Sequence, residues 1–421
     1  MNDAGISKEA MIFRDLPFMG VIYVVVEAMK LGYSPDDSAW VNLGQGQPEV
    51  GPMAGAPPRM DHVPVLASDY AYGPVEGLIE LRKAVAEHYN RLYRRGKASQ
   101  YTHENVVIAS GGRLMLTRVF ATLDEVQMGY FIPDYTAYED LFHAFLRVKP
   151  YRIELRPEDG WAIEPQRLRQ LVRDARLQGL LISNPCNPTG RVIQGQELAE
   201  WVSLAREEKC TLLLDEYYSH FIYAQAPGQT DRPVSSAEWV EDVNRDPVVI
   251  IDGLTKNFRY PGWRMGWAVG PKDLMRRITA AGSFVDGGPS RPIQRAAIQI
   301  LEPERADQET HALRANFHRK RDELVKTLKG LGVTFPLEPQ GTFYAFGSVK
   351  DLPAPLNDGM SFFREALKHK VMTVPGAFFD INPHKQRQGP SSLHAYVRFS
   401  FGPPYPAMVQ GLGQLGKMIR P

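Results

Sequence analysis

Short apolar runs recur along the chain as far as Ile251, and each one ends in a turn rich in glycine, proline or polar residues. Such runs are typical of strands that are buried on both faces, as in a parallel sheet covered by helices. Between them lie segments with apolar residues every three or four positions, which predicts amphipathic helices. The runs predicted to be strands are 105–109, 129–133, 180–183, 211–214 and 248–251.

Strands that alternate with helices predict an α/β fold with a mostly parallel central sheet flanked by helices. After residue 305 the pattern changes: a long charged helix is expected over Arg305–Leu331, followed by the elements of a smaller α+β domain. We therefore expect an N-terminal arm and part of the small domain in residues 1–60. A large domain is expected in residues 61–305, and the rest of the small domain in residues 306–421.

Composition and charge favour work on small molecules. Lysine and arginine number 49 and aspartate and glutamate 48 among 421 residues, so a net charge of +1 favours neither nucleic acid nor a membrane as partner. Cys186 and Cys210 have no disulfide or metal-ligand pattern, and no metal is expected. Residues 1–17 are expected to be a loose arm without targeting features, and the longest apolar stretch, Val21–Val26, is too short to span a bilayer. We expect a cytoplasmic protein.

Lys256 follows the apolar run 248–251 and precedes a segment dense in aromatic residues and glycine. Burial lowers the pKa of a lysine, and the neutral amine can attack a carbonyl carbon to form a Schiff base. Arg264 lies eight residues further on and offers a guanidinium suited to phosphate. The pair suggests a phosphorylated aldehyde as ligand; the alternative is two ordinary surface charges.

Polar residues follow the other predicted strands as well. The glycine turn Gly111–Gly112 opens a helix after the run 105–109 and presents free N–H groups, an arrangement suited to phosphate. Asn187 lies in a rigid turn with two Asn-Pro pairs, and Asp215 directly follows the run 211–214, where its carboxylate needs a cationic partner. Because ligands bind beyond the carboxyl ends of parallel strands, we expect these residues to meet in one site.

The polar segments occur along the chain in the order SGG, PDY, SNPCNPTG, DEYY, TKNFRYPGWRMG and YVRFSFG. Each is common by itself, but their combination resembles the class I/II aminotransferases, enzymes of fold type I that depend on pyridoxal 5′-phosphate (PLP). The resemblance extends over essentially the whole chain from about residue 17 to residue 415. It implies a large PLP-binding domain and transfer of an amino group between an amino acid and a 2-oxo acid.

The resemblance also implies roles for residues at the strand ends. Lys256 would form the Schiff base with PLP and move a proton between the substrate Cα and the cofactor, and Asp215 would pair with the protonated ring nitrogen. Asn187 and Tyr218 would hydrogen-bond the phenolic oxygen of PLP, while Tyr135 would stack on the ring. Lys256, Asp215 and Tyr218 are thus the expected catalytic residues.

The PLP phosphate would be bound by the glycine turn and by side chains of other segments. The residues placed there by the resemblance are Gly111, Gly112, Arg113, Thr255, Arg264 and, reaching across from a partner subunit, Tyr72. The last contact implies a homodimer. Arg398 would bind the substrate α-carboxylate through two nitrogens, helped by Asn187 and the backbone near Gly46.

Some positions depart from the pattern of the family. Many members have a serine three residues before the lysine, where this chain has Gly253. The polar insertion 380–392 is expected to reshape the substrate entrance. Asp286 falls near the place of a partner-subunit arginine that reads a second carboxylate in aspartate aminotransferases, which suggests a basic or polar substrate side chain. The alternative is a loop carboxylate without a substrate role, and Arg291 close by weakens the inference.

Transamination is the expected reaction, but the residues leave other PLP reactions on an amino acid open. These are elimination or replacement, cyclisation, and oxygen-dependent oxidation, since one fold supports several routes. A regulatory module that senses a ligand for a DNA-binding partner would need a basic winged helix-turn-helix ahead of the domain, and residues 1–17 are too short for one. The sequence does not identify the amino donor or acceptor.

Overall fold

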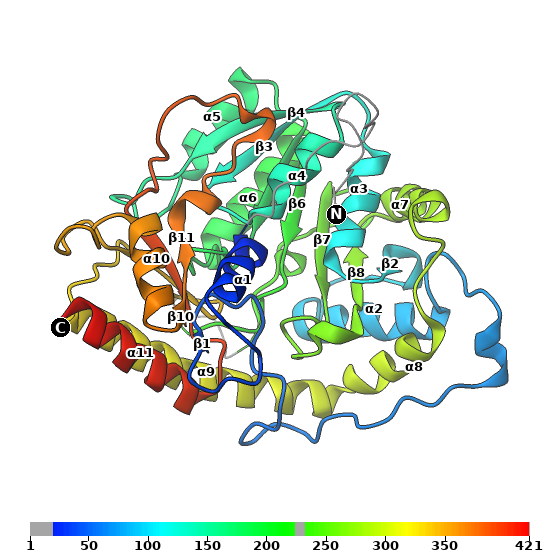
Figure 1. Cartoon of the computed structure of the whole chain (residues 1–421). Coiled ribbons are helices and arrows are strands. Elements are labelled where there is room, and N and C mark those ends of the chain that lie inside the picture. The colour runs from blue at the N-terminus through cyan, green and yellow to red at the C-terminus, as the bar shows by residue number, and fades with distance from the viewer. Residues whose placement is uncertain (1–19, 224–231, 421) are drawn as a thin grey trace, which may run out of the picture.

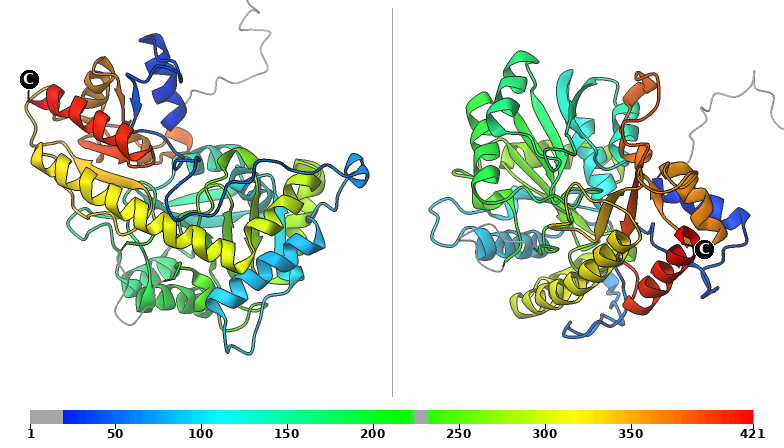
Figure 2. Two further views of the ribbon diagram at one scale, coloured as in Figure 1. Left: turned by 90° about the horizontal axis from the view of Figure 1, so that it is seen from below. Right: turned by 90° about the vertical axis from the view of Figure 1, so that its left-hand side faces the viewer.

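A computed structural model of the chain describes residues 20–223 and 232–420. The loose arm expected over residues 1–17 lies outside the described residues. The expected fold class is confirmed: a mostly parallel seven-stranded sheet is flanked by helices, and two small sheets lie beside it (Figure 1). The long helix α9 (Pro303–Gly330) runs along both parts (Figure 2).

The large sheet contains every strand that was predicted from an apolar run. Its order is β2-β8-β7-β6-β5-β3-β4, and β8 alone runs antiparallel to its neighbours. β5 and β7 are buried along their whole length, as expected of continuous apolar strands in a covered sheet. The unpredicted strands are β4 and β8. The bounds are β2 (Val106–Ala109), β3 (Val126–Ile132), β4 (Val148–Glu154), β5 (Gly179–Ser183), β6 (Thr211–Asp215), β7 (Val248–Gly253) and β8 (Gly266–Val269).

Amphipathic helices pack on this sheet. In α2 the residues Leu81, Val85 and Tyr89 are buried, as their spacing on one helix face predicts. α3 packs on α7 and on β7 and β8, whereas α6 packs on α5 and β6. The bounds are α2 (Ile79–Tyr93), α3 (Gly112–Thr122), α4 (Ala137–Ala144), α5 (Pro165–Asp174), α6 (Gly195–Glu208), α7 (Lys272–Val285) and α8 (Arg291–Ile300).

The small sheets combine strands from both ends of the chain. β1 pairs with β10 in parallel, and a second, antiparallel sheet has the order β11-β12-β9. The pairing of β1 agrees with the expected division into domains, whose boundaries stay a prediction. The bounds are α1 (Gly20–Lys30), β1 (Val41–Asn42), β9 (Tyr344–Ser348), α10 (Gly359–Lys368), β10 (Val371–Met372), β11 (Val374–Pro375), β12 (Tyr396–Ser400) and α11 (Tyr405–Ile419). Among the described residues, no helix is both long enough and apolar enough to cross a membrane.

The insertion 380–392 leaves the small sheets and reaches the large sheet near β3 and β4 (Figure 1). The backbone N–H of Asn382 donates to Glu139 Oε2 of α4 at 2.7 Å, and Lys385 forms an ion pair with the same carboxylate. Asp380 pairs with Arg387 inside the insertion. The insertion therefore ties the small sheets to α4; an effect on the substrate entrance stays a prediction.

Candidate active site

Lys256 lies in the turn after β7, at the edge of the large sheet where the parallel strands end. Its Nζ donates a hydrogen bond to the carbonyl oxygen of Gly46, which lies in the loop after β1. Burial is the main cause that lowers the pKa of Lys256 to about 7, and the charges of nearby arginines add to it. These are Arg398, Arg264 and Arg113. Near neutral pH a large fraction of the amine is therefore neutral, the form that attacks a carbonyl.

Asp215 ends β6 and is 6% exposed. The hydroxyl of Tyr138, from α4, donates to Asp215 Oδ2 at 3.0 Å, and the backbone N–H of Tyr217 lies 3.4 Å from Oδ1. Burial raises the pKa of Asp215 to about 6, so the group is mostly a carboxylate above neutral pH. A buried carboxylate with these neutral donors is suited to a cationic partner.

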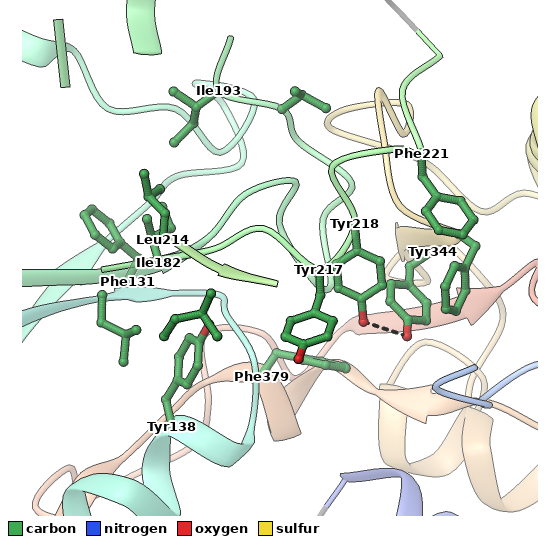
Figure 3. Packing of buried hydrophobic residues seen from close by; sticks show 14 of the residues in the cluster. Phe131, Tyr138, Ile182, Ile193, Leu214, Tyr217, Tyr218, Phe221, Tyr344 and Phe379 are labelled. Atoms are coloured by element: carbon green, nitrogen blue, oxygen red, sulfur yellow. Dashed lines mark hydrogen bonds between the residues drawn. The ribbon is translucent and has the colours of Figure 1, made fainter. Parts of the chain in front are cut away.

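Tyr218 follows Asp215 by three residues and points to the small sheets. Its hydroxyl lies 3.1 Å from that of Tyr344, on β9, and the two share a hydrogen bond (Figure 3). Burial raises the pKa of Tyr218 well above its ordinary value, so the phenol stays protonated. The large and small sheets therefore meet at a pair of hydrogen-bonding phenols.

Arg398 projects from the middle of β12 and is 2% exposed. Its Nη1 donates to Asn187 Oδ1 and its Nη2 to the carbonyl of Gly44, each at 2.8 Å. The guanidinium carbon lies 4.0 Å from the centre of the Tyr344 ring, and Nε is buried without a hydrogen-bond partner. The structure thus brings Arg398 and Asn187 together as expected. Arg398 also contacts the carbonyl of Gly44, whereas the Gly46 carbonyl accepts from Lys256, and a contact of the Gly46 backbone with the substrate stays a prediction.

The glycine turn before α3 lies against Arg264. Gly111 has a φ of 92°, and a Cβ atom there would collide with the Arg264 guanidinium, so only glycine allows this approach. Gly111 is also the N-cap of α3, and no side chain caps the helix. The free N–H groups of the first turn and the guanidinium therefore lie at one place, which suits an anion.

Thr255 adds a hydroxyl to the same region. Its Oγ1 is buried and lacks a hydrogen-bond partner of normal geometry. An unpaired buried hydroxyl is destabilising by about 1–3 kcal/mol, so its presence here indicates a site for a polar ligand atom. The chemistry of this donor set, which comprises helix N–H groups, a guanidinium and a hydroxyl, fits the phosphate of PLP.

Two of the predicted residues lie at the rim of the site. The side chain of Arg113 donates from Nε to the Tyr135 hydroxyl at 3.2 Å, a contact that the sequence did not predict. Tyr72 is 98% exposed in the loop before α2, and its carbonyl accepts from Arg291 Nη1 at 3.3 Å. Within one chain, therefore, the structure does not bring the Tyr72 side chain to the other residues.

Asp286, whose place in the sequence suggested a basic or polar substrate side chain, forms an ion pair with Arg118. Asp286 Oδ1 lies 2.5 Å from Nη2 of Arg118, whose side chain is fully buried, and it also accepts from the Gly288 N–H at 3.2 Å. The guanidinium of Arg118 therefore offsets the charge of this carboxylate, and it donates to both carboxylate oxygens. The ion pair favours the alternative considered for Asp286, a loop carboxylate without a substrate role, and selection of the substrate by Asp286 stays a prediction.

Several contacts of the site were not predicted. Tyr138 follows the end of β3 in a helix, and its position one turn beyond the strand was the only available indication of a contact with Asp215. Tyr344 lies on a strand whose alternation could have placed its side chain on one face, but not opposite Tyr218. Nothing in the sequence predicts the contact of the Gly44 carbonyl, because every residue has a backbone carbonyl.

Solved structures share this fold. The double mutant 1 of the Thermus thermophilus aspartate aminotransferase matches with a TM-score of 0.78 at 22% identity, over 98% of this chain and 99% of that one. An aminotransferase from Mycobacterium tuberculosis matches with a TM-score of 0.76 at 24% identity, over 96% of this chain and 97% of that one. The fold is therefore that of the fold type I PLP-dependent transferases, as expected.

Sequence comparisons narrow the class further. The valine–pyruvate aminotransferase of Mycobacterium tuberculosis is 29% identical over 386 residues, 90% of this chain and 91% of that one. The aspartate aminotransferase of Pyrococcus horikoshii is 27% identical over 391 residues, 90% of each chain. The model of the class I and II aminotransferases matches residues 38–402. The chain belongs to the class I and II aminotransferase family, and it is an aminotransferase.

Proposed function

We propose that this aminotransferase binds PLP through Lys256 and moves an amino group between an amino acid and a 2-oxo acid. The observation that carries the proposal is Lys256 itself, whose pKa is lowered to about 7 by burial and by the positive charges of Arg398, Arg264 and Arg113. Bound to this lysine, PLP would supply an aldehyde carbon and an electron-accepting ring. The other residues of the site bind and orient the reacting groups.

The residues present fit the cofactor at each of its polar groups. The turn at Gly111, with Arg264 and Thr255, suits the phosphate. Asp215 suits a protonated ring nitrogen, because it is buried and mostly ionised above neutral pH. Asn187 accepts from Arg398 through Oδ1, which leaves its Nδ2 as a donor for the phenolic oxygen.

The phenolic oxygen would have a second partner in Tyr218, and the Tyr135 ring would cover one face of the cofactor. Tyr218 is oriented by its hydrogen bond with Tyr344, and Tyr135 by its hydrogen bond from Arg113. Both contacts restrict side-chain rotation before any ligand binds, which reduces the entropy that binding costs.

Arg398 binds the substrate, and Lys256 transfers its proton. Arg398 presents a planar guanidinium to the α-carboxylate and so fixes the orientation of the Cα–H bond. The neutral amine of Lys256 accepts the proton from Cα and returns it, and a pKa near 7 suits both transfers near neutral pH. The Gly46 carbonyl, which accepts from Nζ, would direct the amine.

The test is an absorbance titration of the purified protein with acidic, basic, aromatic and aliphatic amino acids in the absence of any oxo acid. One class of amino acid is expected to remove the visible absorbance of lysine-bound PLP, and a 2-oxo acid to restore it. The responsive class identifies the donor. Release of ammonia or consumption of oxygen during turnover would instead identify elimination or oxidation, and would contradict transamination.

The same titration with Arg398→Lys tests the carboxylate site. Lysine keeps the charge but not the two-pronged hydrogen bonding, so kcat/KM is expected to fall roughly thirtyfold or more. A matched control is Arg118→Lys, which changes a buried arginine that pairs with Asp286 outside the site. This control is expected to lower the melting temperature without changing KM for the amino acid. An unchanged KM in Arg398→Lys would contradict the assigned role.

We also propose a homodimer in which Tyr72 contacts the PLP phosphate of the partner subunit. Support comes from its exposure of 98%, beside Tyr70 at 87% and Val65 at 62%. An apolar loop so exposed suits a protein interface. Light scattering is expected to give twice the mass of one chain, and Tyr72→Phe to weaken PLP binding. A fully active monomer would contradict both the homodimer and the role of Tyr72.

We further propose that the protein is located in the cytoplasm. The free cysteines, Cys186 and Cys210, support a reducing compartment, and cell fractionation tests the location.

A further inference from the structure

Tyr217 lies in the turn after β6, and the roles proposed above do not use its side chain. Its ring fills a space that exists because three neighbouring positions are glycine. A Cβ atom on Gly112 would lie 2.5 Å from Tyr217 Cε2, and one on Gly253 would lie 2.8 Å from Tyr217 Oη. A Cβ atom on Gly266 would collide with the same hydroxyl. The glycines of three segments therefore make room for one phenol.

The Tyr217 hydroxyl is buried and lacks a hydrogen-bond partner of normal geometry. Tyr218, by contrast, shares a hydrogen bond with Tyr344, and Figure 3 shows the Tyr217 ring beside that pair. A buried hydroxyl without a partner destabilises a fold, so such a group is a candidate for contact with a ligand. The surroundings of the hydroxyl indicate which ligand atoms it suits.

The hydroxyl lies in the phosphate cradle, the name used here for the turn Gly111–Gly112 together with Thr255 and Arg264. Thr255 interacts with the Tyr217 hydroxyl, and its own Oγ1 is likewise buried without a normal hydrogen bond. Arg264 acts electrostatically on the same phenol. The turn Gly111–Gly112 touches both groups, because a side chain on Gly111 would meet Arg264 and one on Gly112 would meet Tyr217. The phenol therefore lies among the groups assigned to the phosphate.

We propose that Tyr217 donates a hydrogen bond from its hydroxyl to the phosphate of PLP, beside Thr255 and Arg264. The inference rests on the proposed function and names one further cofactor-binding residue. It also gives a reason for the glycine at position 253. The Tyr217 hydroxyl, from the turn after β6, occupies the space that a side chain on Gly253 would take.

The protonation state of Tyr217 agrees with this role. Burial raises the pKa of the phenol well above its ordinary value, and the negative charges of Asp252 and Asp215 act in the same direction. The hydroxyl therefore keeps its proton near neutral pH. A protonated phenol donates to a phosphate oxygen without charge repulsion.

The experiment compares PLP with pyridoxal, which has the same aldehyde and ring but no phosphate. Dissociation constants are measured by absorbance on the full-length, cofactor-free chain, for the native sequence and for Tyr217→Phe. Loss of one hydrogen bond to a charged group is expected to weaken PLP binding about tenfold or more, and to leave pyridoxal binding within about twofold. The ³¹P resonance of bound PLP is expected to shift as well.

The matched control is Tyr89→Phe, which removes a buried hydroxyl that lies 3.4 Å from Asp252 and outside the cradle. It is expected to leave the ratio of PLP to pyridoxal affinity unchanged. Equal weakening of both ligands in Tyr217→Phe, or no change in either, would overturn the inference and assign the phenol to packing. If the native chain captures neither ligand on Lys256, the proposed function fails instead.

Discussion

Replacing Lys256 with alanine is expected to abolish turnover and the visible absorbance of bound PLP, while the fold remains intact. The amine that would bind the cofactor and move the Cα proton is lost, and no other lysine is assigned to the site. Loss of acid–base catalysis alone lowers the rate by about 10²–10⁴-fold, and loss of the covalent link adds to this. Activity and the absorbance spectrum of the purified variant provide the measurement.

Lys320→Met is the matched control for this change. Lys320 is also buried, and burial lowers its pKa. Its Nζ lies 2.8 Å from Glu49 Oε1 and donates to the carbonyl of Pro403 at 2.7 Å. Its replacement is expected to lower the melting temperature but to keep the absorbance of bound PLP. If Lys256→Ala retains that absorbance, a different lysine binds the cofactor.

The pH dependence of PLP capture tests the same lysine without a substitution. The neutral amine attacks the aldehyde, and its fraction grows as the pH rises through the pKa. In the cofactor-free chain the capture rate is therefore expected to rise with pH and to reach half of its plateau near pH 7, whereas a lysine with the ordinary value of 10.5 would keep rising far beyond. A midpoint above pH 9 would contradict the burial of the amine.

Asp215→Asn is expected to lower kcat by about a hundredfold or more. The substitution keeps the shape of the side chain but removes the negative charge that would keep the ring nitrogen protonated, and loss of one such electrostatic contact costs about 10²–10³-fold. Initial rates at saturating substrate give kcat, and an absorbance titration shows whether the variant still binds PLP. Loss of PLP binding together with activity would leave the charge untested, so both are measured on the same preparation.

Asp134→Asn provides a control with another buried carboxyl group. Burial raises the pKa of Asp134 to about 8, so at neutral pH this group is mostly uncharged, and its Oδ1 lies 2.5 Å from Ser183 Oγ. Asparagine therefore changes no charge there, and kcat is expected to stay within about threefold of the native value. Equal losses in the two variants would show that the Asp215 effect comes from packing and not from charge.

The sequence predicted the large sheet well, because its central strands are continuous apolar runs that end in polar turns. β4 was not predicted, because it is a partly exposed edge strand that contains Pro150 and so lacks a continuous apolar run. β8 escaped because it has only four residues and begins at Gly266, within a segment that reads as a turn. Strand prediction thus succeeded where burial on both faces leaves a clear apolar pattern.

The candidate site was predictable for the same reason. Lys256, Asp215 and Asn187 each follow a predicted strand, and parallel strands bring such ends together. What the sequence could not supply were contacts between distant segments. The contact of Arg398 with the Gly44 carbonyl and the ion pair of Asp286 depend on how separate elements pack. The spacing of apolar residues within one element does not predict such packing.

The pairing of β1 with β10 has a consequence for the synthesis of the chain. Val41 and its partner Val371 are 330 positions apart, and the separation between Gly44 and Arg398 in the sequence is larger still. A ribosome adds residues at about 5–20 per second, so the N-terminal strand exists for tens of seconds before its partner does. During that time Lys256 emerges without the guanidinium that orients its substrate. The carboxylate site proposed around Arg398 is therefore complete only after β12 has been synthesised.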